Sequence, residues 1–184
     1  MRRSLVVVTL VAAAVLGALA CKGPEVASPL TGTSPYLCCN LWFEKPKLND
    51  GTWQVGTKIP FGTRVHVEHV WTNAVQFTPE GFPTLTLSYK YGDKAVPFET
   101  YLNQLFVATD PRSKLKKVPA KRVQAIEQGL IEPGMTKDQV LIARGIPPAH
   151  RTPALQSSSW TYWTNHWDSS VVYFQGDKVD RVAH

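Results

Sequence analysis

The stretch from residue 134 to residue 147 encodes a short helix whose beginning and end are both specified by the sequence. Thr136 precedes Gln139 by three residues, the spacing of a capping box, in which each side chain accepts a hydrogen bond from the other residue's backbone N–H. Gly145 can adopt the positive φ that closes a last helical turn, and the proline two residues later cannot continue a helix. We therefore expect a helix over about 137–144.

The rest of the region 118–184 supplies the elements that this helix needs for packing. Residues 119–128 begin with a proline and stop before a glycine, a pattern typical of a second short helix. Three further stretches have an alternation of side chains that predicts strands, at 160–164, 170–175 and 178–183. The last two are separated by Gly-Asp, a loop of hairpin length. We expect an ααβββ domain in which both helices cover one side of an antiparallel sheet.

Residues 1–20 have the pattern of a secretory signal peptide. Two arginines follow the first methionine, and residues 5–20 are small or apolar apart from one threonine. The run is short for a membrane span, which needs about 20 apolar residues. It ends in Ala-Leu-Ala-Cys21, which resembles the lipobox of bacterial lipoproteins. We expect cleavage and acylation of Cys21, with an ordinary cleaved signal and an incidental cysteine as the alternative.

The segment after the predicted signal indicates where the chain is attached. Residues 21–35 are rich in Gly, Pro, Ser and Thr, which is typical of a flexible tether that lifts the folded parts off the membrane. Lys22 stands where lipoproteins retained in an inner membrane typically carry aspartate. We therefore expect a lipid-anchored protein on the periplasmic face of the outer membrane.

The charge of the chain is mildly basic. Its formal net charge is +6 at pH 7, and removal of residues 1–20, which contain two arginines and no acidic residue, leaves +4. The one basic cluster, Lys-Leu-Lys-Lys at 114–117, is typical of a solvated linker. Because an exported protein does not meet nucleic acid, we exclude nucleic acid as a partner. Contact with anionic lipid headgroups stays open.

Residues 36–110 have the pattern of a β-rich domain. Apolar alternation and turn signals recur roughly every 8 to 12 residues, which predicts short strands at 36–43, 52–55, 64–71, 75–77 and 85–91. Residues 98–106 carry apolar side chains at helical spacing and are expected to form one or two turns that close the domain. By analogy of fold alone, we expect a small β-barrel or sandwich of the SH3-like type. The polar residues 110–117 separate it from the second domain.

Two cysteines besides Cys21 lie next to each other in the first predicted strand, at Cys38 and Cys39. Adjacent side chains in a strand point to opposite faces. Neighbouring Cα atoms are also about 3.8 Å apart, closer than disulfides prefer. We therefore expect buried free thiols, and the absence of a CxxC motif or a histidine cluster argues against a redox or metal role.

Residues that could support chemistry are few and scattered. His66 and His69 are three apart on a predicted strand and face opposite sides, which argues against a shared metal ion. The chain carries no HExxH motif, nucleophile elbow or phosphate-binding loop. His150, His166 and Asp168 lie in one region, and we interpret them as exposed loop residues in preference to a hidden hydrolase site. We expect no enzymatic activity, no metal and no cofactor.

Four pieces of the C-terminal region together resemble the BamE (SmpA/OmlA) family. They are Gly-Met-Thr-Lys-x-Gln-Val at 134–140, Gly-x-Pro at 145–147, Trp-x-Tyr at 160–162 and a Val-Tyr-Phe strand ending in glycine at 172–176. The resemblance covers about residues 121–184 only. It implies an ααβββ domain and a small outer-membrane lipoprotein of the β-barrel assembly machinery. Members of that family begin this domain soon after the lipidated cysteine, whereas a β-rich region intervenes here.

These features predict an adaptor or scaffold lipoprotein that binds an outer-membrane protein complex. We expect its interaction surface at an exposed strand edge beside Trp163 and Trp167, with His150 and Arg151 next to them, because aromatic residues and arginine are favoured in interfaces. Packing of the two tryptophans between the helices and the sheet is an equal alternative. A second hypothesis is that the N-terminal β domain binds a ligand or peptidoglycan and the C-terminal domain supports it.

Overall fold

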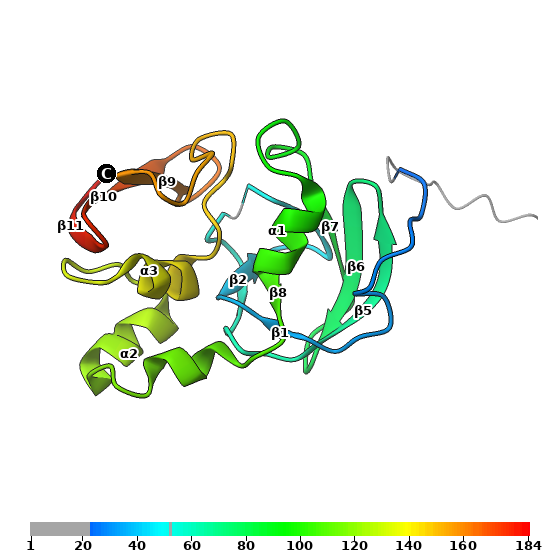
Figure 1. Ribbon diagram of the computed structural model, residues 1–184, viewed down its shortest axis with the longest axis horizontal. Coiled ribbons are helices and arrows are strands. Elements are labelled where there is room, and N and C mark those ends of the chain that lie inside the picture. Colours follow the sequence, from blue (N-terminus) through cyan, green and yellow to red (C-terminus); the bar gives the residue numbers. More distant parts are fainter. Residues whose placement is uncertain (1–22, 52) are drawn as a thin grey trace, which may run out of the picture.

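The computed structural model describes residues 23–51 and 53–184, and its elements are mixed α and β (Figure 1). This agrees with the α+β class expected from the sequence. The predicted signal peptide and Cys21 lie outside the described residues. Within the described ranges, no helix is long and apolar enough to cross a membrane. Figure 1 shows the first half of the chain at one end of the longest axis and the C-terminal strands at the other.

The strands of the first half are short. Their bounds are β1 (Tyr36–Leu37), β2 (Leu41–Phe43), β3 (Lys47–Asn49), β4 (Thr57–Ile59), β5 (Val65–Trp71), β6 (Ala74–Pro79), β7 (Leu85–Ser88) and β8 (Phe106–Val107). They form a four-stranded sheet in the order β3-β7-β6-β5 and two separate pairs, β2-β4 and β1-β8. Every pair is antiparallel except β3 with β7. Helix α1 (Phe98–Leu105) forms where helical turns were expected and buries one face in the same apolar cluster.

The strand expected at residues 52–55 is wrong, because residues 53–55 have no strand structure. Asp50 explains why the chain turns away there. Its side chain is 2% exposed, and its carboxylate accepts hydrogen bonds of 2.7 to 3.1 Å from the backbone N–H groups of residues 90–92. This contact ties the turn after β3 to the loop after β7, so the apolar residues that follow lie outside the sheet.

Strand β5 contains a bulge that reverses the expected faces of its second part. The register with β6 shifts between Val67 and His69, so Glu68 has no partner across the ladder. Val65, Val67 and Val70 are buried, so His66 and His69 are both exposed, which corrects the prediction that the two histidines face opposite sides of the strand. A bulge inserts one extra residue, so after it the side chains that point to the core are shifted by one position.

Residues 23–35 correct the expectation of a flexible tether. They lie along the outer edge of β5, where backbone hydrogen bonds join Val26 to Val70 at 2.9 Å and Gly32 to Val67 at 2.8 Å. Figure 1 shows this blue segment running beside β5. An uncovered edge strand exposes unpaired backbone groups, and this segment satisfies those of β5. Its Gly-rich and Pro-rich composition indicated irregular structure but did not reveal the pairing.

Cys38 and Cys39 form a disulfide with each other, which corrects the expectation of free thiols. That expectation assumed one continuous strand over residues 36–43. The strand instead ends at Leu37, and the chain bends through both cysteines before β2 begins. The alternation of side chains holds only within a strand, so in this bend the two sulfurs can meet.

The second half contains the element order that the sequence predicts. A 3₁₀ turn, η1 (Pro111–Leu115), precedes α2 (Ala120–Gln128), α3 (Lys137–Arg144), β9 (Ser159–Trp163), β10 (Ser169–Gln175) and β11 (Lys178–Ala183). The strands form one antiparallel sheet in the order β11-β10-β9. Trp160 and Tyr162 are fully buried and pack in one cluster with residues of both helices.

Helix α3 has the bounds and the capping box that the sequence predicts. The Thr136 N–H donates to Gln139 Oε1 at 3.1 Å, and the Gln139 N–H donates to Thr136 Oγ1 at 3.3 Å. At the other end, Gly145 has a φ of 87° and donates its N–H to Leu141 O. The positive φ is confirmed, but the ψ of −174° makes this residue extended instead of left-handed helical.

Asn40 connects the two halves. Its side chain is 2% exposed, and its Nδ2 donates to the carbonyl oxygens of Ile126 in α2 and Ala143 in α3, both at 2.9 Å. Its Oδ1 accepts from the Phe61 N–H at 3.1 Å. Each half also contributes a residue to the apolar core of the other. Ile146 of the second half packs in the first apolar cluster, and Phe61 of the first half packs in the second. The two halves therefore share a continuous, hydrogen-bonded junction.

Candidate interaction surface

The turn between β9 and β10, residues 164–168, is fixed by its own polar side chains. Asn165 Oδ1 accepts from the backbone N–H groups of Trp167 at 2.7 Å and Asp168 at 2.9 Å. Asn165 Nδ2 donates to Asp168 Oδ2 at 2.8 Å, and Thr164 donates both its N–H and its hydroxyl to Asp168 O. Asparagine and aspartate favour such turns because their short side chains bond backbone groups two residues away.

Trp167 projects from this fixed turn with 88% of its surface exposed. In the described part of the chain, the other exposed large apolar residues are Leu130 at 50% and Val26 at 40%. Packing between the helices and the sheet, which was the alternative for this tryptophan, is therefore wrong, and Trp160 fills that position instead. A single exposed apolar side chain is common on protein surfaces, so Trp167 marks a candidate interaction site only together with the arginine and aromatic side chains at the same edge of the sheet.

His166 attaches the turn to the first half of the chain. Its Nε2 lies 3.0 Å from Glu44 Oε2, and its ring lies 4.3 Å from the ring of Trp53. Both side chains of the ion pair are about half exposed, so the pair adds little stability by itself. The ion pair instead positions the turn, because it holds the residues that carry Trp167 beside the loop after β2.

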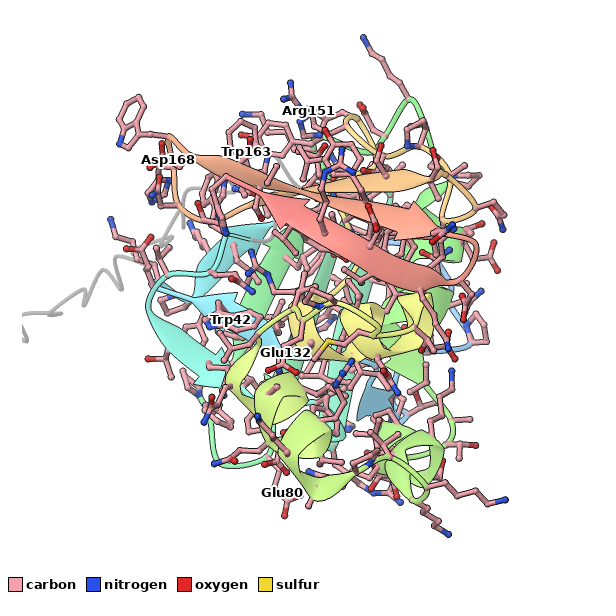
Figure 2. All side chains as sticks on the ribbon, turned by 90° about the vertical axis from the view of Figure 1, so that its left-hand side faces the viewer. Trp42, Glu80, Glu132, Arg151, Trp163 and Asp168 are labelled. Atoms are coloured by element: carbon pink, nitrogen blue, oxygen red, sulfur yellow. A yellow bond between two sulfur atoms is a disulfide. The ribbon has the colours of Figure 1, made fainter. Side chains whose placement is uncertain are left out.

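The other predicted surface residues lie along the same edge of the sheet. The Arg151 guanidinium carbon lies 5.6 Å from the centre of the Trp163 ring, and Trp163 is half-buried. The rings of His150 and Tyr91 are 5.3 Å apart. Figure 2 shows Arg151, Trp163 and Asp168 at this edge. Of the four predicted residues, Arg151 and Trp163 thus contact each other and His150 contacts Tyr91 of the first half, whereas Trp167 extends into solvent from the neighbouring turn.

Some backbone groups of the edge strands β9 and β11 already have hydrogen-bond partners within the chain. At β9, the Thr161 N–H donates to the Thr152 hydroxyl at 3.0 Å, and at the start of β11 the Val179 N–H donates to Met135 O at 2.8 Å. The exposed strand edge expected from the sequence is therefore partly occupied by the chain's own groups. Side chains of the turn 164–168 provide the more accessible contact.

Two buried ionisable groups lie behind this surface. The Arg144 guanidinium lies 5.5 Å over the Tyr162 ring, and the Tyr162 hydroxyl donates to Gly145 O at 3.0 Å. Burial lowers the pKa of Arg144 to about 10, and burial raises the pKa of Tyr162 well above its ordinary value. Together they support β9 from the side opposite the surface and do not reach it.

The histidines and the aspartate that were considered as possible catalytic or metal-binding residues do not form one site. His166 faces Glu44, whereas the Asp168 carboxylate faces Asn165, so the two have different partners. His66 and His69 are both exposed, and His69 Nδ1 lies 2.8 Å from Glu25 Oε1. Among the residues that the structure describes, no three His, Cys, Asp or Glu side chains are grouped to hold a metal ion.

A cleft of about 320 Å³ lies next to the turn 164–168. Its walls are mostly from the loops around β2 and β3, and His166 closes it from the second half. The aromatic residues Trp42, Phe43 and Trp53 line it together with Lys45, Lys47 and Glu44. In Figure 2, Trp42 lies between the C-terminal sheet and α2. The cleft therefore offers aromatic side chains, two lysines and one carboxylate to a ligand.

A second cavity of about 340 Å³ lies between η1, α3 and the end of α1. Its lining is mostly apolar, with Cys38 from the first half and Leu141 and Leu155 from the second. The ion pair of Lys114 and Asp138, at 3.0 Å, lies among its lining residues. Its volume is in the lower range of small-molecule sites.

Comparison with protein-family models, curated proteins and solved structures gives no match for this chain. Sequence reasoning missed Asn165, Glu44 and Trp53. The Asn-x-x-Asp spacing at 165–168 is a turn signal that could have identified the first, whereas the other two are distant in sequence and carried no such signal.

Proposed function

We propose that this chain is an outer-membrane-anchored lipoprotein that acts as an adaptor, with the turn 164–168 as its contact for a protein partner. The observation that carries the proposal is the 88% exposure of Trp167 on a turn whose backbone is already fixed. A partner that covers this indole gains a large apolar contact, and little conformational entropy is lost because the turn is pre-ordered.

The surroundings of Trp167 support a protein partner. Arg151 and Trp163 lie at the same edge of the sheet, and tryptophan and arginine are the residue types most enriched among dominant interface contacts. His166 and Glu44 form a polar rim on the other side. An apolar centre with a polar rim is the usual composition of a protein interface.

The fold supports a more specific proposal for the second half. Its order of two helices and three antiparallel strands is the order that the resemblance to the BamE family implies, so we propose a BamE-like domain at 118–184. Under this proposal the partner is a component of an outer-membrane assembly complex on the periplasmic face. For the first half, 36–110, an SH3-like description remains our proposal.

The test is affinity capture from detergent-solubilised outer membranes with the full-length lipoprotein. We expect the wild-type chain to retain an outer-membrane protein that Trp167→Ala loses, while both chains melt at the same temperature. Leu130→Ala is the matched control, because Leu130 is also apolar and 50% exposed but lies after α2. Equal capture by all three chains would show that Trp167 is not part of the interface.

A second candidate function is binding of a periplasmic glycan such as peptidoglycan by the first half. It is favoured by the cleft that Trp42, Trp53, Lys45 and Lys47 line. Tryptophan faces stack on sugar rings, and ammonium groups pair with carboxylates. Sedimentation with purified peptidoglycan tests it, and Trp53→Ala should release the chain into the supernatant whereas Trp167→Ala should not. A chain that never sediments contradicts this candidate and leaves the adaptor proposal standing.

A further inference from the structure

The start of the folded chain is attached to the turn between β5 and β6. The Gly23 N–H donates to Asn73 Oδ1 at 3.0 Å, and Thr72 donates its N–H and its hydroxyl to Pro24 O at 3.0 and 3.1 Å. Gly23 lies so close that a Cβ on it would be 2.9 Å from the Cβ of Thr72. Gly23, which follows Cys21 by two positions in the sequence, is therefore already held against this turn.

This short spacing limits the distance between the proposed lipid and the folded body. An extended chain spans about 3.5 Å per residue, so two residues reach about 7 Å. That distance is comparable with the headgroup layer on each side of a bilayer, roughly 5 to 8 Å thick. We infer that the β5–β6 turn and the groove beside it lie directly against the bilayer that holds Cys21. The inference rests on the lipid anchor of the proposed function.

The groove has the surface that a lipid contact requires. It has a volume of about 280 Å³ and lies between residues 26–30, the end of β5 and helix α1. Val26 is 40% exposed, and Trp71 and Phe98 line the same groove. Tryptophan is favoured at the headgroup level of membranes because its ring is amphipathic. The occupant is the leaflet of phospholipid around the anchor, because the two-residue spacing keeps the start of this surface close to the acylated cysteine.

This placement sets the orientation of the whole molecule. Figure 1 shows the start of the described chain at one end of the longest axis and the strands β9 to β11 at the other. With the first end on the bilayer, the second half is directed toward the periplasm. A partner would therefore meet the turn 164–168 at a distance from the lipid surface, and the folded body itself serves as the spacer.

Depth-dependent quenching in vesicles tests the inference. The acylated full-length chain is labelled with a fluorophore at Val26→Cys or, as the matched distal control, at Asp180→Cys on β11, where the native side chain is exposed. Cys38 and Cys39 do not react because they are bonded to each other. In phosphatidylethanolamine and phosphatidylglycerol vesicles that contain a nitroxide-headgroup lipid, we expect strong quenching at position 26 and none at position 180.

A spacer variant and mass spectrometry distinguish a wrong placement of the groove from a missing lipid anchor. Insertion of a Gly/Ser spacer of about ten residues after Cys21 should keep the chain on vesicles but remove most of the quenching at position 26. Equal quenching at both positions, or none at either, with intact acylation overturns the inference while the adaptor proposal stands. A mature chain without fatty acid overturns the anchor itself.

Discussion

In the second half of this chain, β9 pairs with β10 and β10 with β11, so every strand pairs with its neighbour in sequence. In the first half, β3 pairs with β7 across about half of the domain and β1 pairs with β8 across nearly all of it, whereas β5, β6 and β7 pair with their neighbours in sequence. The second half is therefore built from pairs of neighbouring strands, whereas the first half adds to one such meander several strands that depend on distant partners.

This difference has a consequence for stability and folding. Local pairs close short loops, whereas the pairs β1–β8 and β3–β7 of the first half close long ones and cost more entropy before any contact forms. The first half compensates with contacts that hold distant loops together, such as Asp50 on residues 90–92 and the segment 23–35 on β5. The predictions below test whether the halves differ in this way and how strongly Asn40 couples them.

The largest effect is expected for Trp160→Ala in the second half. Trp160 is fully buried and packs on the Phe174 ring at 4.7 Å, so its removal leaves a large cavity. The free energy of unfolding should fall by about 4 kcal/mol. Trp167→Ala is the control and should change it by less than about 0.5 kcal/mol, because the side chain is exposed. Urea denaturation measures both, and similar losses for the two variants would contradict the placement of these rings.

Asn40→Ala should weaken the junction between the halves. The change removes the Asn40 partner of the carbonyl oxygens of Ile126 and Ala143 and of the Phe61 N–H in a buried site, while Ile126 O keeps the N–H of Gly129. We expect a loss of about 3 kcal/mol and separate unfolding transitions for the two halves, because the buried hydrogen bonds between them are removed. Denaturation followed by circular dichroism and by tryptophan fluorescence would reveal this. Coincident transitions in the variant would mean that apolar contacts alone couple the halves.

Alkaline pH should destabilise both halves through their buried tyrosines, of which Tyr101 in the first half and Tyr162 in the second are the most strongly affected. Burial raises the pKa of Tyr101 in the first half and of Tyr162 in the second. A raised pKa in the folded state means that stability is full below the ordinary tyrosine pKa of about 10 and is lost as pH rises above it. Each tyrosine should cost about 1.4 kcal/mol per pH unit in that range. Tyrosinate absorbance should rise together with unfolding, and ionisation of these two tyrosines in the folded protein would contradict their burial.

The smallest effect is expected for Thr136→Ala, which removes the side-chain half of the capping box. Loss of the acceptor for the Gln139 N–H should reduce the free energy of unfolding by about 1 kcal/mol. Thr136→Ser should restore most of it, because serine presents the same hydroxyl. If the loss approached that of Asn40→Ala, α3 would depend on more than its local signal.

The comparison also explains what could be predicted from the sequence. The bounds of α3 follow from Thr136, Gln139 and Gly145, which all lie within the helix ends. The bulge at Glu68 and the position of Trp53 depend on strands and loops far away in sequence, and no local pattern encodes them. For the candidate surface, Trp167 was identified by residue type, whereas its 88% exposure follows from tertiary structure.

Site-specific photo-crosslinking in growing cells tests the central claim most directly. A photoreactive amino acid replaces Trp167 or, in the control chain, Leu130, and the crosslinked proteins are identified by mass spectrometry. The adaptor account predicts one outer-membrane protein bound at position 167 and absent at position 130. Crosslinks of equal yield at both positions, or none at position 167 in a chain that is correctly acylated and folded, would contradict it.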